Sequence, residues 1–362
     1  MEVDPRPEER EQPLSATVLE RGAAYDRPAR KGRSAWRLLW SLLLLAFCGS
    51  LALNVLLFIA AGLSNLTTDS GNKVQEKHFS HQRGGRDKVA IISVEGTILS
   101  GEGFVKKQID RAVEDSNVKA VVLRVDSPGG TITGSDYIYH HLREMTAKRK
   151  IPIVVSMGGL AASGGYYVSM ACGDTPDVVF AEPTTWTGSI GVIIPHYDLS
   201  ALLKDWGVKE DSIASHPLKT MGSLAKPMTQ QEIDIFKALV DESFGRFKSI
   251  IRRGRPKFAK DPAALDELAT GQIYTADQAL ANGLIDKIGF IESAIDRAIE
   301  LAKLDKDNVE VVEYQREPNL ASLLMGGQAR QSSFDLAAMF DSAAPRAYYL
   351  YTSLPPLLER GK

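Results

Sequence analysis

The chain has 362 residues, of which 44% are hydrophobic and 24% are charged, and its formal net charge at pH 7 is −2. This balance is that of an ordinary globular protein, and it argues against a basic nucleic-acid-binding protein. The length suits one large α/β domain with appended segments. The two cysteines, Cys48 and Cys172, form no disulfide framework, and the six histidines show no metal-ligand spacing. We therefore expect neither a metal site nor a nucleic-acid partner.

A long apolar segment without a charged residue lies near the amino terminus, from Leu38 to Leu63. As a helix it would be roughly 39 Å long, which is enough to cross a bilayer with some tilt. A cleaved signal peptide would have a shorter apolar core. Cys48 suggests a lipoprotein site, but Phe47 stands before it where a small residue is needed. The favoured interpretation is an uncleaved transmembrane anchor over residues 36–63.

The charges on either side of this segment predict its orientation. No Lys or Arg occurs in residues 64–72, whereas residues 27–37 contain five basic residues: Arg27, Arg30, Lys31, Arg33 and Arg37. Because basic residues are retained on the cytoplasmic side, we expect the N-terminus in the cytoplasm and everything after residue 64 across the membrane.

Composition divides the rest of the chain. Residues 1–35 are rich in Pro, Glu and Arg and predict a disordered cytoplasmic tail. Residues 64–87 are polar and predict a linker. Residues 88–304 carry regular patterning and form the predicted globular domain. Residues 305–362 are expected to be a flexible or peripherally packed extension.

The first half of the globular domain alternates between two kinds of pattern. Short apolar runs predict buried strands, and the segments between them predict helices. Strands that alternate with helices imply parallel βαβ units, and hence an α/β fold. The predicted strands cover residues 89–98, 120–126, 151–157 and 177–182, and the predicted helices cover 106–114, 135–148 and 166–171.

The second half predicts a long helix from Thr229 to about Arg253, with Thr229 and Glu232 as a capping box. Apolar residues recur on it at spacings of three and four and predict a single stripe that faces the core. This stripe consists of Ile233, Phe236, Val240, Phe244, Phe247 and Ile251. Residues 270–289 predict a strand and a short helix that begins at Thr275 and ends at Gly283, and a last helix is expected over 291–301.

Ser163 is the leading candidate for chemistry. It lies in AASGGYY (161–167), directly after an apolar strand, where glycines allow a sharp turn that exposes the hydroxyl. The amides that follow it open a helix, where partial positive charge collects. A second glycine turn, DSPGG (126–130), could supply the other half of an oxyanion hole. The alternative is a tight packing turn without chemistry.

A serine nucleophile needs a base. His140 and His141 lie on a charged helix face, while His196 and His216 remain possible bases. A lysine can replace histidine when its surroundings keep it neutral. Lys219, in KTMGS (219–223), is the candidate lysine, and the alternative is an ordinary surface lysine.

Five sequence motifs occur in order along the globular domain: VEGTI (94–98), RVDSPGG (124–130), SMGGLAASGGYYVSMAC (156–172), TGSIGV (187–192) and KTMGSLAKPMT (219–229). Together they resemble the motifs of the signal peptide peptidase SppA family, whose members are membrane-anchored serine peptidases. The resemblance covers about Lys88 to Leu304 and implies a Clp protease/crotonase-like fold, a repeated ββα spiral.

The resemblance also implies a site. Ser163 would be the nucleophile and Lys219 the general base, forming a Ser–Lys dyad. Ser189 would orient the lysine amine, and the amides of Gly130 and Gly164 would form the oxyanion hole. The implied chemistry requires no cofactor and no metal.

The implied substrates are signal peptides left in the membrane, with misfolded membrane or exported proteins as a further class. The resemblance further implies homo-oligomers with sites built between subunits, at the bacterial inner membrane. Three departures bear on substrate preference and assembly: SLAKP (223–227), the insertion CGDTP (172–176), and the tail beyond about residue 315.

Three alternatives stay open. The first is a non-catalytic scaffold of the same fold that binds membrane proteins, the second a crotonase-type acyl-thioester enzyme, and the third a processing peptidase for one exported protein.

Overall fold

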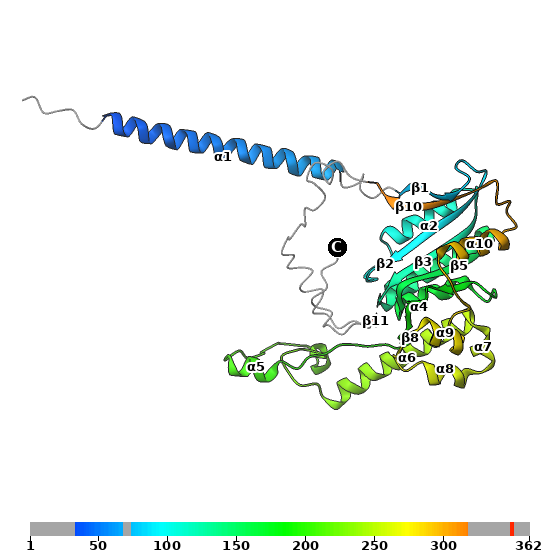
Figure 1. The fold of residues 1–362 in the computed structure, drawn as a ribbon. Coiled ribbons are helices and arrows are strands. Elements are labelled where there is room, and N and C mark those ends of the chain that lie inside the picture. Colours follow the sequence, from blue (N-terminus) through cyan, green and yellow to red (C-terminus); the bar gives the residue numbers. More distant parts are fainter. Residues whose placement is uncertain (1–32, 68–73, 318–347, 351–362) are drawn as a thin grey trace, which may run out of the picture. The chain divides into compact units, whose positions relative to one another are not determined.

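The computed structural model describes residues 33–67, 74–317 and 348–350, and the chain divides into two units, 1–63 and 64–362 (Figure 1). The described part of the first unit belongs to helix α1 (Arg33–Thr67), which contains the predicted segment 36–63. Among the residues the structure describes, no helix qualifies as a membrane span by length and apolarity. Nearly all of the predicted tail 1–35 lies outside the described residues.

The second unit is built on a nine-stranded sheet in the order β1-β10-β2-β3-β5-β6-β9, with β7 paired to β5 and β8. All pairings in it are parallel except β1 with β10 and β7 with β8. The central strands are apolar runs because helices cover the sheet and leave little of it in water. The strands are β1 (Val74–His81), β2 (Asp87–Glu95), β3 (Val118–Ser127), β5 (Ile153–Ala162), β6 (Val179–Ala181), β7 (Trp186–Gly188), β8 (Ile273–Thr275), β9 (Lys287–Ile288) and β10 (Val309–Arg316). The predicted α/β class is confirmed.

The sheet extends past the limits drawn from composition. Strand β1 lies inside the predicted linker 64–87, and β10 lies inside the predicted extension 305–362. β10 inserts between β1 and β2, where Val309, Val311 and Val312 are buried. Burial of these valines explains why a segment that follows the last predicted helix belongs to the sheet.

A small second sheet joins β4 (Gly129–Thr131) to β11 (Tyr348–Leu350). α2 packs on β2, α10 packs on β3 and β5, and α4 packs on α3. The helices are α2 (Phe104–Glu114), α3 (Ile132–Arg149), α4 (Gly164–Ser169), α5 (Ser200–Asp205), α6 (Gln230–Gly254), α7 (Pro256–Lys260), α8 (Pro262–Leu268), α9 (Ala276–Asn282) and α10 (Ile291–Leu301), with short 3-10 turns η2 (Met170–Cys172) and η3 (Pro217–Thr220).

The predicted helix boundaries are confirmed where capping chemistry marks them. Thr229 and Glu232 form the expected capping box on α6, and Thr275 caps α9 in the same way with Gln278. α9 ends at Gly283 with φ 74°, a left-handed conformation that glycine adopts without strain.

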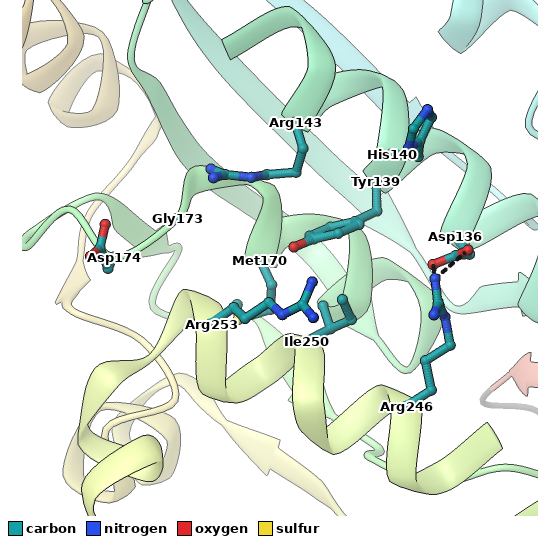
Figure 2. A pocket seen from close by; sticks show the side chains of 10 residues that line it. All are labelled: Asp136, Tyr139, His140, Arg143, Met170, Gly173, Asp174, Arg246, Ile250 and Arg253. Carbon is teal, nitrogen blue, oxygen red and sulfur yellow. Dashed lines mark hydrogen bonds and ion pairs between the residues drawn. The ribbon is translucent and has the colours of Figure 1, made fainter. Parts of the chain in front are cut away.

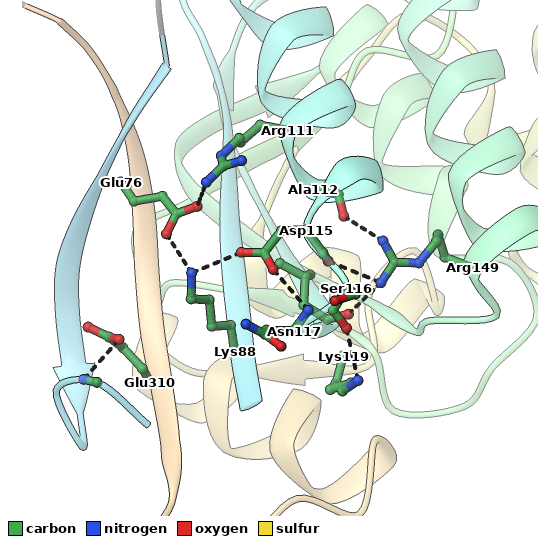
Figure 3. A network of polar contacts seen from close by, with 12 residues as sticks. Glu76, Lys88, Arg111, Ala112, Asp115, Ser116, Asn117, Lys119, Arg149 and Glu310 are labelled. Atoms are coloured by element: carbon green, nitrogen blue, oxygen red, sulfur yellow. Dashed lines mark hydrogen bonds and ion pairs between the residues drawn. The ribbon is translucent and has the colours of Figure 1, made fainter. Parts of the chain in front are cut away.

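Charged side chains tie β1, β2 and the end of α2 together (Figure 3). Lys88 Nζ lies 2.7 Å from Glu76 Oε2 and 2.9 Å from Asp115 Oδ2, while Arg111 reaches the other oxygen of Glu76 at 2.8 Å. Arg149 of α3 donates to four carbonyl oxygens at the end of α2 and the start of β3, including those of Ala112 and Asp115. These contacts hold together the end of the sheet at which β2 and β3 begin.

Residues Gly191–Gln231, which we call the arm, differ from the rest of the second unit, which we call the body. No residue of the arm is buried, although the structure describes all of them. Large apolar side chains on it are exposed, including Trp206 (71%) and Ile213 (103%). Figure 1 shows α5 at the far end of this stretch, apart from the sheet. The arm therefore has no core of its own.

The apolar stripe of α6 is buried at one end and partly exposed at the other. Phe247 and Ile251, in the carboxyl-terminal half, are buried, but Ile233 is 41% exposed and Val240 and Phe244 are only partly covered. The prediction that the whole stripe faces the core is therefore wrong for its amino-terminal half. Glu232, on the first turn of α6, is buried and pairs with Lys226 of the arm, but this contact leaves the neighbouring Ile233 exposed.

Candidate active site

Ser163 lies where β5 ends and α4 begins, with φ 53° and ψ −113°. Such a backbone is costly for a non-glycine residue and persists only when the surroundings impose it. Here the Ser163 amide donates to Gly188 O of β7 at 2.8 Å, and its carbonyl accepts from Tyr167 N at 2.9 Å. The predicted sharp turn at Ser163 is confirmed.

The backbones of Gly130 and Gly164 lie close to each other beside this turn. A Cβ built on Gly164 would lie 3.1 Å from Gly130 N and 2.4 Å from Ser135 Oγ, and one on Gly130 would lie 2.0 Å from Ile98 O. No side chain fits at either position, which explains why both are glycine. The structure thus brings together the two segments that carry the predicted oxyanion donors.

The direction of the Gly130 amide follows from its neighbours. Ile98 N donates to Gly129 O, and Thr131 N donates to Ile98 O, each at 2.8 Å. Since the polar groups of successive residues in a strand point to opposite edges, the N–H of Gly130 points away from Ile98. It therefore faces the edge of β4 that pairs with β11.

A cavity of about 430 Å³ opens next to Ser163. Ser189, which has φ 47° and is only 7% exposed, also lines it, and its amide donates to Gln272 O at 2.7 Å. Within residues 74–317 and 348–350, neither serine hydroxyl makes a hydrogen bond. Ser163 and Ser189 therefore line the same cavity, while the orienting role expected for Ser189 stays a prediction.

Several apolar side chains contribute to the wall of this cavity, which Ser163, Ser189 and Thr270 also line. They include Ile190, Val192 and Ile193 after β7, and Val240 and Phe244 of α6. Val240 and Phe244 belong to the α6 stripe that was expected in the core. The signal for them was present in the sequence, but the helical period alone does not say whether a stripe faces a core or a cavity.

Lys219 is not brought to this cavity within the chain. It lies on the short turn η3 of the arm, it is exposed, and it is absent from the cavity wall. The two alternative bases, His196 and His216, also lie on the arm. There His196 Nε2 lies 3.4 Å from Ser223 O, and His216 Nδ1 accepts from Leu218 N at 3.2 Å. The body thus holds the candidate nucleophile and the candidate oxyanion amides, while the candidate bases lie on the arm.

Buried contacts hold the helix that begins at Ser163. Tyr166 Oη donates to Leu284 O at 2.7 Å, and burial raises the pKa of this phenol. Nearby, Arg255 pairs with Asp286 at 2.7 Å, and Asp286 Oδ2 also accepts from Val178 N and Val179 N. Burial alone would raise the pKa of Asp286, but the hydrogen bond and charge of Arg255 outweigh it and hold that pKa below its usual range.

Cys172 is no competing nucleophile. It is buried at the end of the turn that follows α4, and burial raises its pKa to about 12. A thiol with such a pKa stays protonated at neutral pH, whereas the thiolate is the reactive form.

A separate cavity of about 510 Å³ lies between α3, α6 and the turn η2 (Figure 2). Its wall includes Arg143, Arg246 and Arg253, of which Arg246 pairs with Asp136 at 2.8 Å. Ser163 does not line it.

His140, His141 and Glu144 on α3 bring three potential metal ligands within 4.8 Å of one another in the described residues. Glu144 is already engaged by Lys148 at 2.8 Å, which weakens it as a ligand.

Comparison with known proteins agrees with this geometry. Residues 145–305 match the model of Peptidase family S49. A candidate protease of Synechocystis sp. is 37% identical over 273 residues, which cover 75% of this chain and 95% of that protein. A candidate signal peptide peptidase SppA of Enterococcus faecium is 31% identical over 339 residues, covering 83% and 96%. Protease 4 of Salmonella typhi is 35% identical over 246 residues, covering 66% of this chain but only 38% of that protein.

The chain therefore belongs to peptidase family S49, and the predicted resemblance to the SppA family is confirmed. It is a serine-type peptidase. The mainly parallel sheet with Ser163 at the carboxyl end of β5 fits this family.

Proposed function

We propose that Ser163 and Lys219 form the catalytic dyad of a membrane-anchored endopeptidase that degrades signal peptides. The observation that carries this proposal is the turn at Ser163. A buried serine in a strained backbone conformation presents an unengaged hydroxyl to an apolar cavity, next to the converging amide segments of Gly130 and Gly164. Strain of this kind gathers at functional sites, and paired backbone amides are the usual oxyanion donors.

The proposed reaction needs only groups of the protein and water. Neutral Lys219 accepts the proton of Ser163 Oγ while this oxygen bonds to the scissile carbonyl carbon. The amides of Gly130 and Gly164 bind the resulting oxyanion, and loss of one such donor costs about 3–4 kcal/mol. Lys219 then passes the proton to the departing amine as the C–N bond breaks. Water attacks the acyl ester by the same route, releasing the acid and restoring Ser163, while Ser189 orients the lysine amine.

We propose further that the arm of one copy completes the site of another copy in a homo-oligomer. Two features support this: Lys219 lies outside the cavity of its own chain, and the arm exposes large apolar side chains such as Trp206, Val208 and Ile213. Monomeric proteins rarely leave so much apolar surface to water, so a second copy would both cover this surface and deliver the lysine.

The remaining parts of the proposal concern location and organisation. Residues 36–63 anchor the chain in the bacterial inner membrane, with the tail 1–35 in the cytoplasm and the peptidase domain, folded as a Clp-like ββα spiral, on the other side. The uncharged segment 38–63 and the basic residues before it support this arrangement. The apolar wall of the cavity suits signal peptides, which are rich in Ala and Leu, and the similarity to a candidate signal peptide peptidase supports the same substrate class.

Covalent labelling of the full chain with a fluorophosphonate, read by intact mass and peptide mapping, tests the proposal. We expect one label on Ser163, and none in Ser163→Ala or Lys219→Ala. Lys209→Ala, which changes another exposed lysine of the arm, is the matched control and should label like the wild type. Unlabelled Ser163 in the assembled wild-type protein would instead support the non-catalytic scaffold.

A further inference from the structure

The cavity between α3, α6 and the turn η2 gathers positive charge away from the proposed catalytic site (Figure 2). Its volume is about 510 Å³, and none of the residues proposed for catalysis lines it. Three arginines contribute to its wall from two helices: Arg143 from α3, and Arg246 and Arg253 from α6. Guanidinium groups that meet around one hollow from separate elements suit an anionic ligand.

The two aspartates of the wall leave part of this positive charge unbalanced. Asp136 is already engaged, because Arg246 Nη2 reaches both of its oxygens at 2.8 Å and Tyr167 Oη donates to its Oδ1 at 2.5 Å. Asp174 is exposed, so water and salt screen its charge. The charges of Arg143 and Arg253 therefore remain to attract a ligand.

The guanidinium groups of Arg143 and Arg253 also keep most of their hydrogen-bond donors. Arg143 donates to Ala171 O at 3.3 Å. Arg253 makes no hydrogen bond or ion pair with any residue that the structure describes. A guanidinium carries five N–H groups in one plane, so each of these two arginines can still bind oxygen atoms of a ligand.

The hydroxyl of Tyr139 is a third donor that the protein does not use. Tyr139 lines the cavity and is only 8% exposed, yet its hydroxyl has no hydrogen-bond partner among residues 33–67, 74–317 and 348–350. Figure 2 shows this side chain pointing from α3 into the space between the two helices, with Arg143 on the α3 side and Arg253 on the α6 side. A nearly buried hydroxyl without a protein partner is normally satisfied by a ligand or by water.

We propose that this cavity binds a phosphate group, held by the guanidinium groups of Arg143 and Arg253 and by Tyr139 Oη, either as inorganic phosphate or as the phosphate of a lipid headgroup. A carboxylate has two oxygens in one plane, whereas the oxygens of a phosphate point in several directions and can accept from donors on two helices. Met170 and Ile250 add an apolar part to the wall, which leaves a place for the carbon atoms of a phosphate ester. Phosphate binding here is a further activity of the chain and not a step of peptide hydrolysis.

Calorimetric titration of the full-length protein in a non-ionic detergent with inorganic phosphate, at constant ionic strength, tests this site. We expect saturable binding with one phosphate per chain. Arg143→Ala and Arg253→Ala should each weaken it about tenfold or more, because each removes a charge-assisted hydrogen bond. Arg253→Lys keeps the charge but loses the planar fork, so its affinity should lie between those of Arg253→Ala and the wild type.

Two further variants complete this comparison. Tyr139→Phe keeps the ring and removes only the hydroxyl, and it should weaken phosphate binding by about fivefold. Arg86→Ala, a change of an exposed arginine that does not line the cavity, is the matched control and should bind like the wild type. Circular dichroism verifies that each variant is folded, and Arg253→Ala, which removes an exposed side chain without a protein partner, carries the comparison by itself if another variant does not fold.

Competition separates the two sources of phosphate. Soluble dihexanoylphosphatidylglycerol should displace inorganic phosphate from the wild type if the cavity takes a lipid headgroup, and it should fail to do so if the cavity takes only the free ion. Either result supports a phosphate site. Acetate at the same concentration should displace neither ligand, because it lacks the additional oxygens.

No saturable phosphate binding, together with a melting temperature that phosphate does not raise, would overturn the inference. Equal affinity in the wild type and Arg253→Ala, or displacement of phosphate by acetate, would overturn it as well. Since Ser163 takes no part in these measurements, their outcome is independent of the proposed peptidase function.

Discussion

The body and the arm of the peptidase unit differ in how much of each is buried. In the body, Ser163, Gly130 and Gly164 are held by a buried sheet and by backbone hydrogen bonds, so one copy of the chain arranges the proposed nucleophile and the proposed oxyanion amides. In the arm, Gly191–Gln231, no residue is buried, and Lys219 is exposed. Preorganised groups require a rigid scaffold, while a group delivered by another copy requires only an accessible segment.

This difference predicts opposite consequences of mutation. Changes in the arm should reduce activity or assembly and leave the unfolding of the single chain unaltered. Changes in the buried contacts of the body should reduce stability. The following expectations separate the two regions.

The largest effect is expected for Lys219→Ala. Loss of the proposed general base should lower kcat/KM for a peptide substrate by about 10⁴-fold, as for other members of catalytic groups. The free energy of unfolding should change by less than about 0.5 kcal/mol, because the side chain is exposed. Steady-state kinetics and chemical denaturation check both statements, and a destabilised Lys219→Ala protein would show that the arm does pack on the body.

A large loss of stability is expected for Asp286→Asn. This change leaves the guanidinium of Arg255, which is only 11% exposed, without its charged partner. Breaking a buried pair from one side costs about 3–5 kcal/mol, here reduced by the remaining exposure of the pair to about 3 kcal/mol. Urea denaturation measures it, and Asp266→Asn, an exposed carboxyl paired with Lys248, is the control that should cost little.

The same carboxyl predicts a pH dependence. Because Arg255 holds the folded pKa of Asp286 below its unfolded value of about 3.9, its stabilising contribution is fully present above that value and is lost as pH falls from about 4 through the folded pKa. Stability measured between pH 6 and 3 should therefore fall less steeply in Asp286→Asn than in the wild type. Parallel profiles would show that Asp286 does not contribute.

The smallest effect on folding is expected for Trp206→Ser in the arm. Trp206 is 71% exposed, so the unfolding free energy should change by less than about 0.5 kcal/mol. If a second copy covers this side chain, the assembled mass measured by light scattering should decrease. Asp205→Asn, at the neighbouring position, serves as the control for the assembly measurement.

The sequence predicted the body well because its signals are local. Apolar runs mark β2, β3 and β5, capping residues mark α6 and α9, and glycines mark the turns at Gly130 and Ser163. The outer strands β1 and β10 were not foreseen, since their pairing joins segments more than 200 residues apart and leaves no local trace. For the same reason the sequence predicted the strand–helix turn at Ser163 and not the cavity wall of Val240 and Phe244.

The position of Lys219 on the arm was harder to predict from the sequence. A lysine in a motif indicates chemistry, but its distance from the nucleophile depends on packing that the arm does not supply within one chain. The tail presents the reverse case: it was expected to be flexible or peripheral, yet Tyr349 is fully buried against Tyr167 and Phe247.

The central claim is that the serine of one copy and the lysine of another form one site. Ser163→Ala and Lys219→Ala carry different tags, are co-expressed, and are purified together through both tags, and peptide hydrolysis is then measured. Each variant alone should be inactive, whereas the mixed assembly should recover about a quarter of wild-type activity, since random pairing joins an intact serine to an intact lysine in that share of sites. A mixed assembly as inactive as its parents would contradict the account.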